Sequence, residues 1–181
     1  MSSVARRYAK AILAVAESGG TLDKTAGELV ALARVAKEPQ VAAAFTNPLM
    51  SETRRRELAD TIAKELGVQT TVAHFVSLLA DHQRLDQMAA IAVQYNRQLD
   101  EKLHRVRAVV RSATEIDAAD LARIVEVFEK KTGKSVLAEA IVDADLLGGV
   151  TVDIAGKVYD GSLRTQLENL ASSIAGSQSF I

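Results

Sequence analysis

The amino-acid sequence predicts an α+β protein, with an N-terminal six-helix antiparallel bundle over residues 1–105 and a small C-terminal α/β domain over residues 106–181 that holds a short sheet and two helices. Three observations predict this fold class. Apolar residues recur at helical spacing as far as Leu103. Beyond Leu103 the apolar period falls to about two, which is typical of a half-buried strand. Gly148-Gly149 then precedes two short alternating runs, as in a hairpin.

The first predicted helix begins at Ser2 or Ser3, either of which can cap it, and ends at Gly19-Gly20. Its apolar residues cover more of the circumference than the roughly 100° that one core-facing stripe needs, because residues 11–16 are all apolar. Two interpretations stay open: the helix is buried on all sides, or one face packs inward while the other meets a partner helix. The pattern does not separate the inner face from the outer one.

Five more helices are predicted before the strand begins. Their ranges are Thr21 to about Glu38, Pro39 to Asn47, Ser51 to Gly67, Thr70 to about Asp81, and Asp86 to Leu103. In the helix that follows Ser51, we expect Leu58, Ile62 and Leu66 to face the core. The run Arg54-Arg55-Arg56 is expected to be a solvated face, because consecutive helical residues point about 100° apart. The helix from Thr70 again carries more apolar residues than one stripe, and it is the second candidate for a helix with two apolar faces.

The C-terminal domain is predicted from alternation and capping residues. A strand over residues 106–110 has a basic second face, a helix capped by Asp117 runs to Gly133, and a second strand covers residues 136–142. The hairpin pairs residues 150–154 with residues 157–159. Ser162 then caps a last helix, whose apolar stripe consists of Leu163, Leu167, Leu170 and Ile174.

Composition and motif spacing argue against a chemical function. The chain has no cysteine, and its net charge of −1 gives no support for nucleic-acid binding. His74, His82 and His104 do not stand at metal-ligand spacing, and no Ser-His-acid set can be assembled. Gly133-Lys134-Ser135 lacks the earlier glycine of a phosphate-binding loop. We therefore expect no catalytic residue, no cofactor and no metal. The sequence also shows neither a signal peptide nor an apolar run of the roughly 20 residues that span a membrane.

Several stretches resemble one known family. They are Asp143 to Gly149, which includes the DxxLLGG turn, the run YDGSLRTQLENL from Tyr159 to Leu170, the opening run VARRYAKA from Val4 to Ala11, Asn47-Pro48, and Arg84-Leu85. Together they resemble the delta subunit of F-type ATP synthase, whose mitochondrial counterpart is the oligomycin-sensitivity-conferring protein. The likeness covers nearly the whole length. The C-terminal structural motif consists of Asp145, Gly148, Gly149, Asp160, Gly161 and Ser162.

The resemblance implies a non-catalytic stator connector, present once per complex, that links the alpha/beta catalytic head to the peripheral stalk. In such a subunit the helical domain binds N-terminal segments of alpha subunits, and the C-terminal domain binds the C-terminal region of subunit b. Membrane contact is then indirect, and the absence of a transit peptide implies the cytoplasmic face of a bacterial inner membrane. Carried onto this chain, the residues that line the groove for the alpha segment are Tyr8, Ala11, Ile12, Val15, Phe75 and Leu78.

Two other functions stay open at this point. One is an unrelated helical adaptor that binds a different amphipathic helix, and the other is an enzyme whose site has no recognisable motif. Tyr8 also has an alternative placement, in the core of the bundle instead of the groove.

Overall fold

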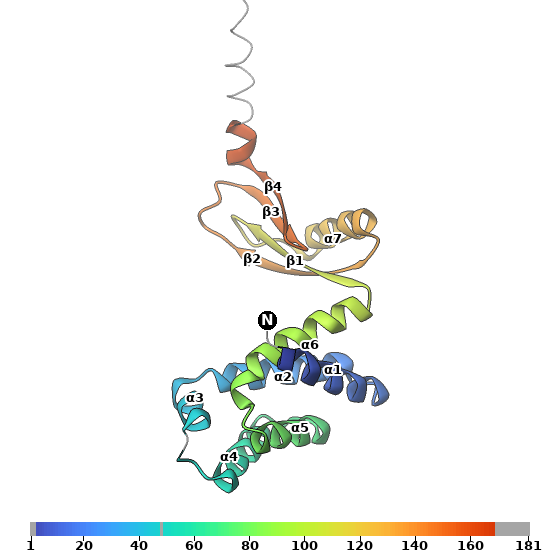
Figure 1. Cartoon of the computed structure of the whole chain (residues 1–181). Helices are drawn as coiled ribbons and strands as arrows, with labels where there is room; N and C mark the ends of the chain where they lie inside the picture. The colour runs from blue at the N-terminus through green and yellow to red at the C-terminus, as the bar shows by residue number, and fades with distance from the viewer. Residues whose placement is uncertain (1–2, 48, 169–181) are drawn as a thin grey trace, which may run out of the picture. The chain divides into compact units, whose positions relative to one another are not determined.

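The computed structural model describes residues 3–47 and 49–168, and its chain divides into two compact units, Met1–Leu99 and Asp100–Ile181 (Figure 1). The fold is α+β, as predicted, with a four-stranded mixed sheet in the C-terminal unit. All regular elements described in the N-terminal unit are helical. They are α1 (Ser3–Ser18), α2 (Leu22–Ala36), α3 (Pro39–Thr46), α4 (Glu52–Glu65), α5 (Thr70–Asp81), the 3-10 turn η1 (Leu85–Gln87) and α6 (Met88–Lys102), whose last residues belong to the C-terminal unit.

The N-terminal core is built from small and aliphatic side chains on five of these helices, since α3 contributes no buried residue. Leu29, Leu79, Ile91 and Leu99 are fully buried in it. Tyr95 is also fully buried, and its hydroxyl donates a hydrogen bond of 2.9 Å to the carbonyl oxygen of Leu22. This bond satisfies a polar group that is otherwise costly to bury.

Helix α4 packs differently from the prediction. Its buried stripe consists of Arg55, Ala59 and Ala63, whereas Leu58 and Ile62 are half-buried and Leu66 is 37 % exposed. The predicted stripe was therefore wrong for Leu66, whereas Ile62 packs against the core from its edge. The physical reason is size: the small side chains of Ala59 and Ala63 let α4 lie close to its neighbours, so the larger residues are displaced to the edges of the contact.

The prediction that the run Arg54-Arg55-Arg56 is solvated was also wrong at one position. The side chain of Arg55 is 4 % exposed and donates one hydrogen bond of 3.2 Å to the carbonyl oxygen of Met50. Its Nε and Nη1 atoms are buried and have no hydrogen-bond partner among the described residues. Two smaller corrections concern helix starts: the side chain of Thr21 makes no capping hydrogen bond, and Asp86 lies in η1, so that α6 starts at Met88.

The C-terminal unit contains β1 (Arg105–Ser112), α7 (Ala118–Thr132), β2 (Ser135–Val142), β3 (Gly149–Ile154) and β4 (Lys157–Ser162), followed by a helical turn over residues 163–168. The strand order is β2-β1-β3-β4, with β1 and β2 parallel and the other two pairs antiparallel. The predicted caps of α7 are confirmed, because Asp117 accepts a hydrogen bond of 2.7 Å from the backbone N–H of Asp120 and Gly133 is left-handed at φ +67°. The predicted continuation of the last helix to Leu170 and Ile174 lies outside the described residues.

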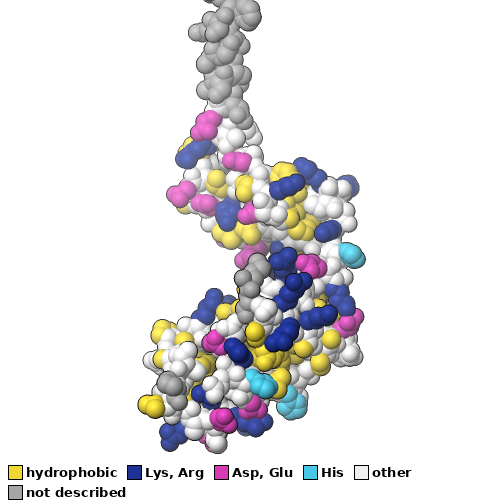
Figure 2. Space-filling view, viewed as in Figure 1, with side chains coloured by type: hydrophobic (Ala, Val, Ile, Leu, Met, Phe, Trp, Pro, Cys, Tyr) yellow, Lys and Arg dark blue, Asp and Glu magenta, His cyan; other side chains and the backbone are white. Residues whose placement is uncertain are grey.

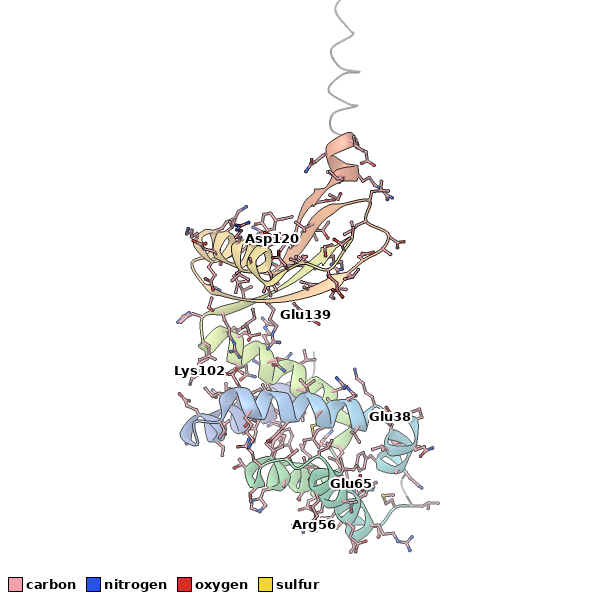
Figure 3. The ribbon with its side chains drawn as sticks, turned by 180° about the vertical axis from the view of Figure 1, so that it is seen from behind. Glu38, Arg56, Glu65, Lys102, Asp120 and Glu139 are labelled. Carbon is pink, nitrogen blue, oxygen red and sulfur yellow. The ribbon has the colours of Figure 1, made fainter. Side chains whose placement is uncertain are left out.

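Helix α7 covers one face of this sheet. Ala108, Val110, Val136, Val152 and Ile154 point toward it from β1, β2 and β3, and Phe128 of α7 completes the core. Seen from behind, Asp120 on α7 and Glu139 on β2 lie on opposite sides of the sheet (Figure 3). The strand side chains alternate accordingly, so one face is apolar and the other is mixed.

The two glycine-containing parts of the C-terminal motif meet at the end of the sheet. Gly149 pairs with Ser162, and the backbone N–H of Leu163 donates to the carbonyl oxygen of Gly148 at 3.0 Å. A Cβ atom on Gly149 would overlap the carbonyl oxygen of Gly161, and the φ of Gly149 is +81°. Only glycine fits such a close approach without a shift of the backbone.

Polar groups of the same motif start the last helix. The carboxylate of Asp160 accepts hydrogen bonds from the N–H of Ser162 at 2.8 Å and from the hydroxyl of Thr165 at 2.9 Å. These bonds hold the pKa of Asp160 below its ordinary value. The preceding turn is organised by Asp143, whose carboxylate accepts from the N–H of Asp145 at 3.1 Å, so Asp145 contributes its backbone to this turn.

Candidate partner-binding surfaces

The first surface lies where α1 and α5 run past each other. Tyr8 of α1 contacts Phe75 of α5 edge to face, with 6.2 Å between ring centroids. Beside this contact Tyr8 is half-buried, Ala11 is exposed, and Val15 and Leu78 are 52 % and 44 % exposed. We call Tyr8, Ala11, Val15 and Leu78 the α1–α5 strip. Figure 2 shows apolar side chains open to solvent on the N-terminal unit, next to basic ones.

Helix α1 has two distinct apolar faces. Its inward face consists of Ala5, Ala9, Ile12, Leu13 and Ala16, all buried. Its outward apolar residues belong to the α1–α5 strip. The interpretation of α1 as a helix buried on all sides is therefore wrong, and the surplus of apolar residues that the sequence shows lies at the surface.

Two of the six predicted groove residues belong to the core. Ile12 is 3 % exposed and Phe75 is 7 % exposed, and both pack inside the N-terminal unit. Ile12 follows Ala5 and Ala9 on the inward face of α1, and Phe75 lies beside Val72, Val76 and Leu79 on α5. The resemblance placed both residues in the groove, and neither is solvent-accessible in the structure. Phe75 still supports the strip from below through Tyr8.

The second surface lies between α7 and the β3–β4 hairpin. A hollow of about 450 Å³ opens there, with an apolar lining on both sides. We call it the α7–β3 hollow, and its main lining residues are Ile124, Val127, Phe128, Val150, Val152 and Tyr159. Phe128 and Tyr159 meet edge to face with 5.0 Å between ring centroids, and the Nζ atom of Lys131 lies 4.1 Å from the centre of the Tyr159 ring.

Sequence reasoning missed this hollow. Residues from α7, β3 and β4 meet only after the chain has folded, so no local pattern joins them. One local signal was available, because helical spacing predicts an inward stripe on α7 and the apolar Val127 lies outside it. That stripe consists of Leu121, Ile124, Val125 and Phe128. Val127 is 60 % exposed in the structure.

Both surfaces are mainly apolar. Within residues 3–47 and 49–168, no cluster of three or more His, Cys, Asp or Glu side chains is placed to hold a metal ion. The lowered pKa of Asp160 is explained by its hydrogen bonds within the C-terminal motif. Both surfaces offer exposed apolar area, which is a feature of protein–protein contacts.

No helix in the described part of the chain is both long enough and apolar enough to cross a membrane.

The model of the family "ATP synthase delta (OSCP) subunit" matches residues 4–174. The chain belongs to this family. It is 37 % identical over 171 residues to the ATP synthase subunit delta of Myxococcus xanthus (strain DK1622), which covers 93 % of this chain and 94 % of that protein. It is 38 % identical over 173 residues to the subunit delta of Xanthomonas campestris pv. campestris (strain B100), covering 96 % and 97 % of the two chains.

The fold agrees with this assignment. A chain in the cryo-EM structure of the Toxoplasma gondii mitochondrial ATP synthase hexamer superimposes with a TM-score of 0.61 at 17 % identity, covering 96 % of this chain and 98 % of that one. The predicted family is thus confirmed. As a delta (OSCP) subunit, the protein is a non-catalytic connector in the stator of the F-type ATP synthase. The alternative of an unrelated helical adaptor is set aside.

Proposed function

We propose that the protein joins the alpha/beta catalytic head to the peripheral stalk through two separate contacts. Residues 1–105 bind N-terminal segments of the alpha subunit, and residues 106–181 bind the C-terminal region of subunit b. One copy serves each complex, at the cytoplasmic face of a bacterial inner membrane, and it touches that membrane only through its partners. The observation that carries the first contact is the exposed apolar α1–α5 strip.

The geometry of the strip suits an amphipathic helix laid along α1. Such helices dock through apolar anchors at helical spacing, and Tyr8, Ala11 and Val15 offer matching positions on one side of α1. Leu78 supplies the opposite wall from α5. Ala11 lies between larger neighbours, and its small side chain lets a partner backbone approach closely. We further propose that the six α-helices act as one antiparallel bundle that fixes the spacing of α1 and α5.

The contact must persist while the rotor turns, because a connector that dissociates during the cycle cannot oppose torque. Persistence depends on a low dissociation rate, which buried apolar anchors provide better than charges at a rim. The α1–α5 strip meets this requirement, since its exposed residues are apolar and rest on a fully packed core.

Calorimetric titration of the full-length chain with a peptide of the alpha-subunit N-terminus tests this proposal. Ala11→Asp places a charge in the strip, and Ala122→Asp makes the same change at an exposed position of α7. We expect at least a tenfold loss of affinity for the first variant and none for the second, with unchanged helical circular dichroism in both. A wild-type chain that does not bind the peptide would refute the proposed contact. Unfolding of Ala11→Asp would show that Ala11 belongs to the core.

A further inference from the structure

Strand β2 forms one edge of the sheet, because the strand order is β2-β1-β3-β4. Its sequence SVLAEAIV contains no proline and only one charged residue, Glu139. Most of the strand is exposed, including Leu137 and Ile141, each at 41 %, and Val142 at 53 %. A long apolar edge of this kind pairs readily with another strand unless the sequence protects it.

Hydrogen bonds at the ends of β2 show which backbone groups face the free edge. The N–H of Asp143 donates to the carbonyl oxygen of Ser112 at 2.8 Å, on the side of β1. The N–H of Val136 donates instead to the side chain of Glu129 on α7, at 3.0 Å. Because backbone groups alternate in direction along a strand, the even-numbered residues of β2 point their N–H and C=O groups away from β1. The groups at the free edge therefore belong to Ala138, Ala140 and Val142.

A second copy of β2 fits this edge in an antiparallel register centred on Glu139. In that register Ala138 exchanges backbone hydrogen bonds with Ala140 of the second copy. Val136 lies opposite Val142, and Leu137 lies opposite Ile141, so these cross-strand pairs are apolar. Between residues 136 and 142, only the central pair is charged.

The central pair sets Glu139 against the same residue of the second copy. Glu139 is exposed, and its neighbour in β1 is Val109, which brings no cation to it. Because the backbone groups of Glu139 point toward β1, the central pair is a non-hydrogen-bonded one, in which the Cα atoms lie about 4.5 Å apart. Like charges directly opposite each other are destabilising. The adjacent registers, centred on Ala138 or Ala140, place Glu139 opposite an apolar side chain instead.

We propose that the edge of β2 is a self-complementary pairing surface and that the charge of Glu139 prevents two copies of this chain from joining there. A second copy is the partner that fits, since one strand supplies both halves of a two-fold contact. A single charge on an edge strand is a known type of protection against such pairing. The inference goes beyond the proposed function and does not depend on either contact described there.

Sedimentation equilibrium of the full-length chain tests the role of the charge. Glu139→Thr removes the charge and introduces a residue that favours strands. We expect this variant to self-associate at least fivefold more tightly than the wild-type chain. Glu115→Thr makes the same change at an exposed acid outside the sheet and should have no effect. A Glu139→Thr variant that associates no more tightly than the wild-type chain would overturn the proposal.

A mixing experiment tests the register. Glu139→Lys alone again sets two like charges at the centre, so it should stay as monomeric as the wild-type chain. An equimolar mixture of the two chains sets an ammonium group opposite the Glu139 carboxylate, and we expect a heterodimer at least fivefold tighter than either homodimer. Glu115→Lys replaces it in the control mixture. If no heterodimer forms, the register centred on Glu139 is wrong and the proposal fails.

A proline substitution tests whether the edge itself is the interface. Ala140→Pro removes an N–H that faces the free edge, and it removes no bond to β1. Added to Glu139→Thr, it should abolish the association and leave the circular dichroism unchanged. Hydrogen exchange locates the interface independently of how the proline variant folds, because the amides of Ala138 and Ala140 should exchange more slowly in the Glu139→Thr dimer. A dimer without this protection forms through another surface and would contradict the assignment.

Discussion

The pairing of Gly149 with Ser162 makes a quantitative prediction for Gly149→Ala. The new Cβ atom overlaps the carbonyl oxygen of Gly161 and lies 3.0 Å from the Cα atom of Ser162. Both neighbours are backbone atoms, so a rotamer change cannot relieve the contact. Either β4 moves away from β3 at this point, or β3 changes its backbone angles, and each response disturbs the start of the helical turn at Leu163.

The expected loss of stability in Gly149→Ala has two parts. A residue with a Cβ atom held at the φ of +81° costs about 1–2 kcal/mol. Forcing extra volume against a packed backbone adds about 1–3 kcal/mol. The total is about 2–5 kcal/mol, against roughly 4–12 kcal/mol expected for a unit of about 80 residues. Gly149→Ala therefore removes a large share of the stability of the C-terminal unit.

Gly156→Ala provides the matched control. Gly156 also has a positive φ, +77°, but nothing lies within 4 Å of its Cβ position. Gly156→Ala therefore carries only the backbone cost of about 1–2 kcal/mol and no steric cost. Urea denaturation, followed by circular dichroism and by hydrogen exchange of β3 amides, measures both variants in the full chain. Equal losses of stability for the two alanine variants would refute the reasoning, because the close approach would then cost nothing.

Two further predictions concern charged groups. The pKa of Asp160 is lowered in the folded state, so the carboxylate's contribution to stability is present above its ordinary pKa of 3.8 and is lost as the pH falls through the lower, folded pKa. The acid unfolding midpoint of the C-terminal unit should therefore shift in Asp160→Asn. An unchanged acid unfolding profile would contradict this. Arg55→Met removes two buried nitrogen atoms that have no partner among the described residues, at the cost of one hydrogen bond to Met50. We therefore expect a gain of about 1 kcal/mol in urea denaturation, and a loss of stability would contradict this reasoning.

The sequence correctly predicted those helix ends that a single residue determines. The cap of α4 is formed by Ser51, which accepts from the N–H of Arg54 at 3.3 Å, and α7 ends at Gly133 because its left-handed conformation favours glycine. The family followed from motifs of the same local kind, since the glycine turn and the cap at Ser162 stand at fixed offsets along the chain.

The sequence failed where the outcome depends on which neighbours meet. Leu58 was assigned to the core from its helical spacing, yet Ala59 is the buried residue because α4 packs closely. For the same reason periodicity indicated two apolar faces on α1 but could not say which one holds the buried Ile12. The α7–β3 hollow was missed altogether, since Val127 and Tyr159 are far apart in the chain. Local patterns determine elements, and packing determines which face of each element is left for a partner.

Two contacts on separate compact units have a mechanical consequence for a connector. Neither proposed contact needs to be among the tightest known, because the two act together. Once one partner is bound, the chain between the units keeps the second site at a high effective concentration near its own partner, and a transient release at one end is followed by rebinding before the complex separates. Torque resistance then depends on both dissociation rates and on the intact covalent chain. If the two proposed contacts hold, a variant with a weakened α1–α5 strip should therefore remain attached to the stalk yet allow the head to slip.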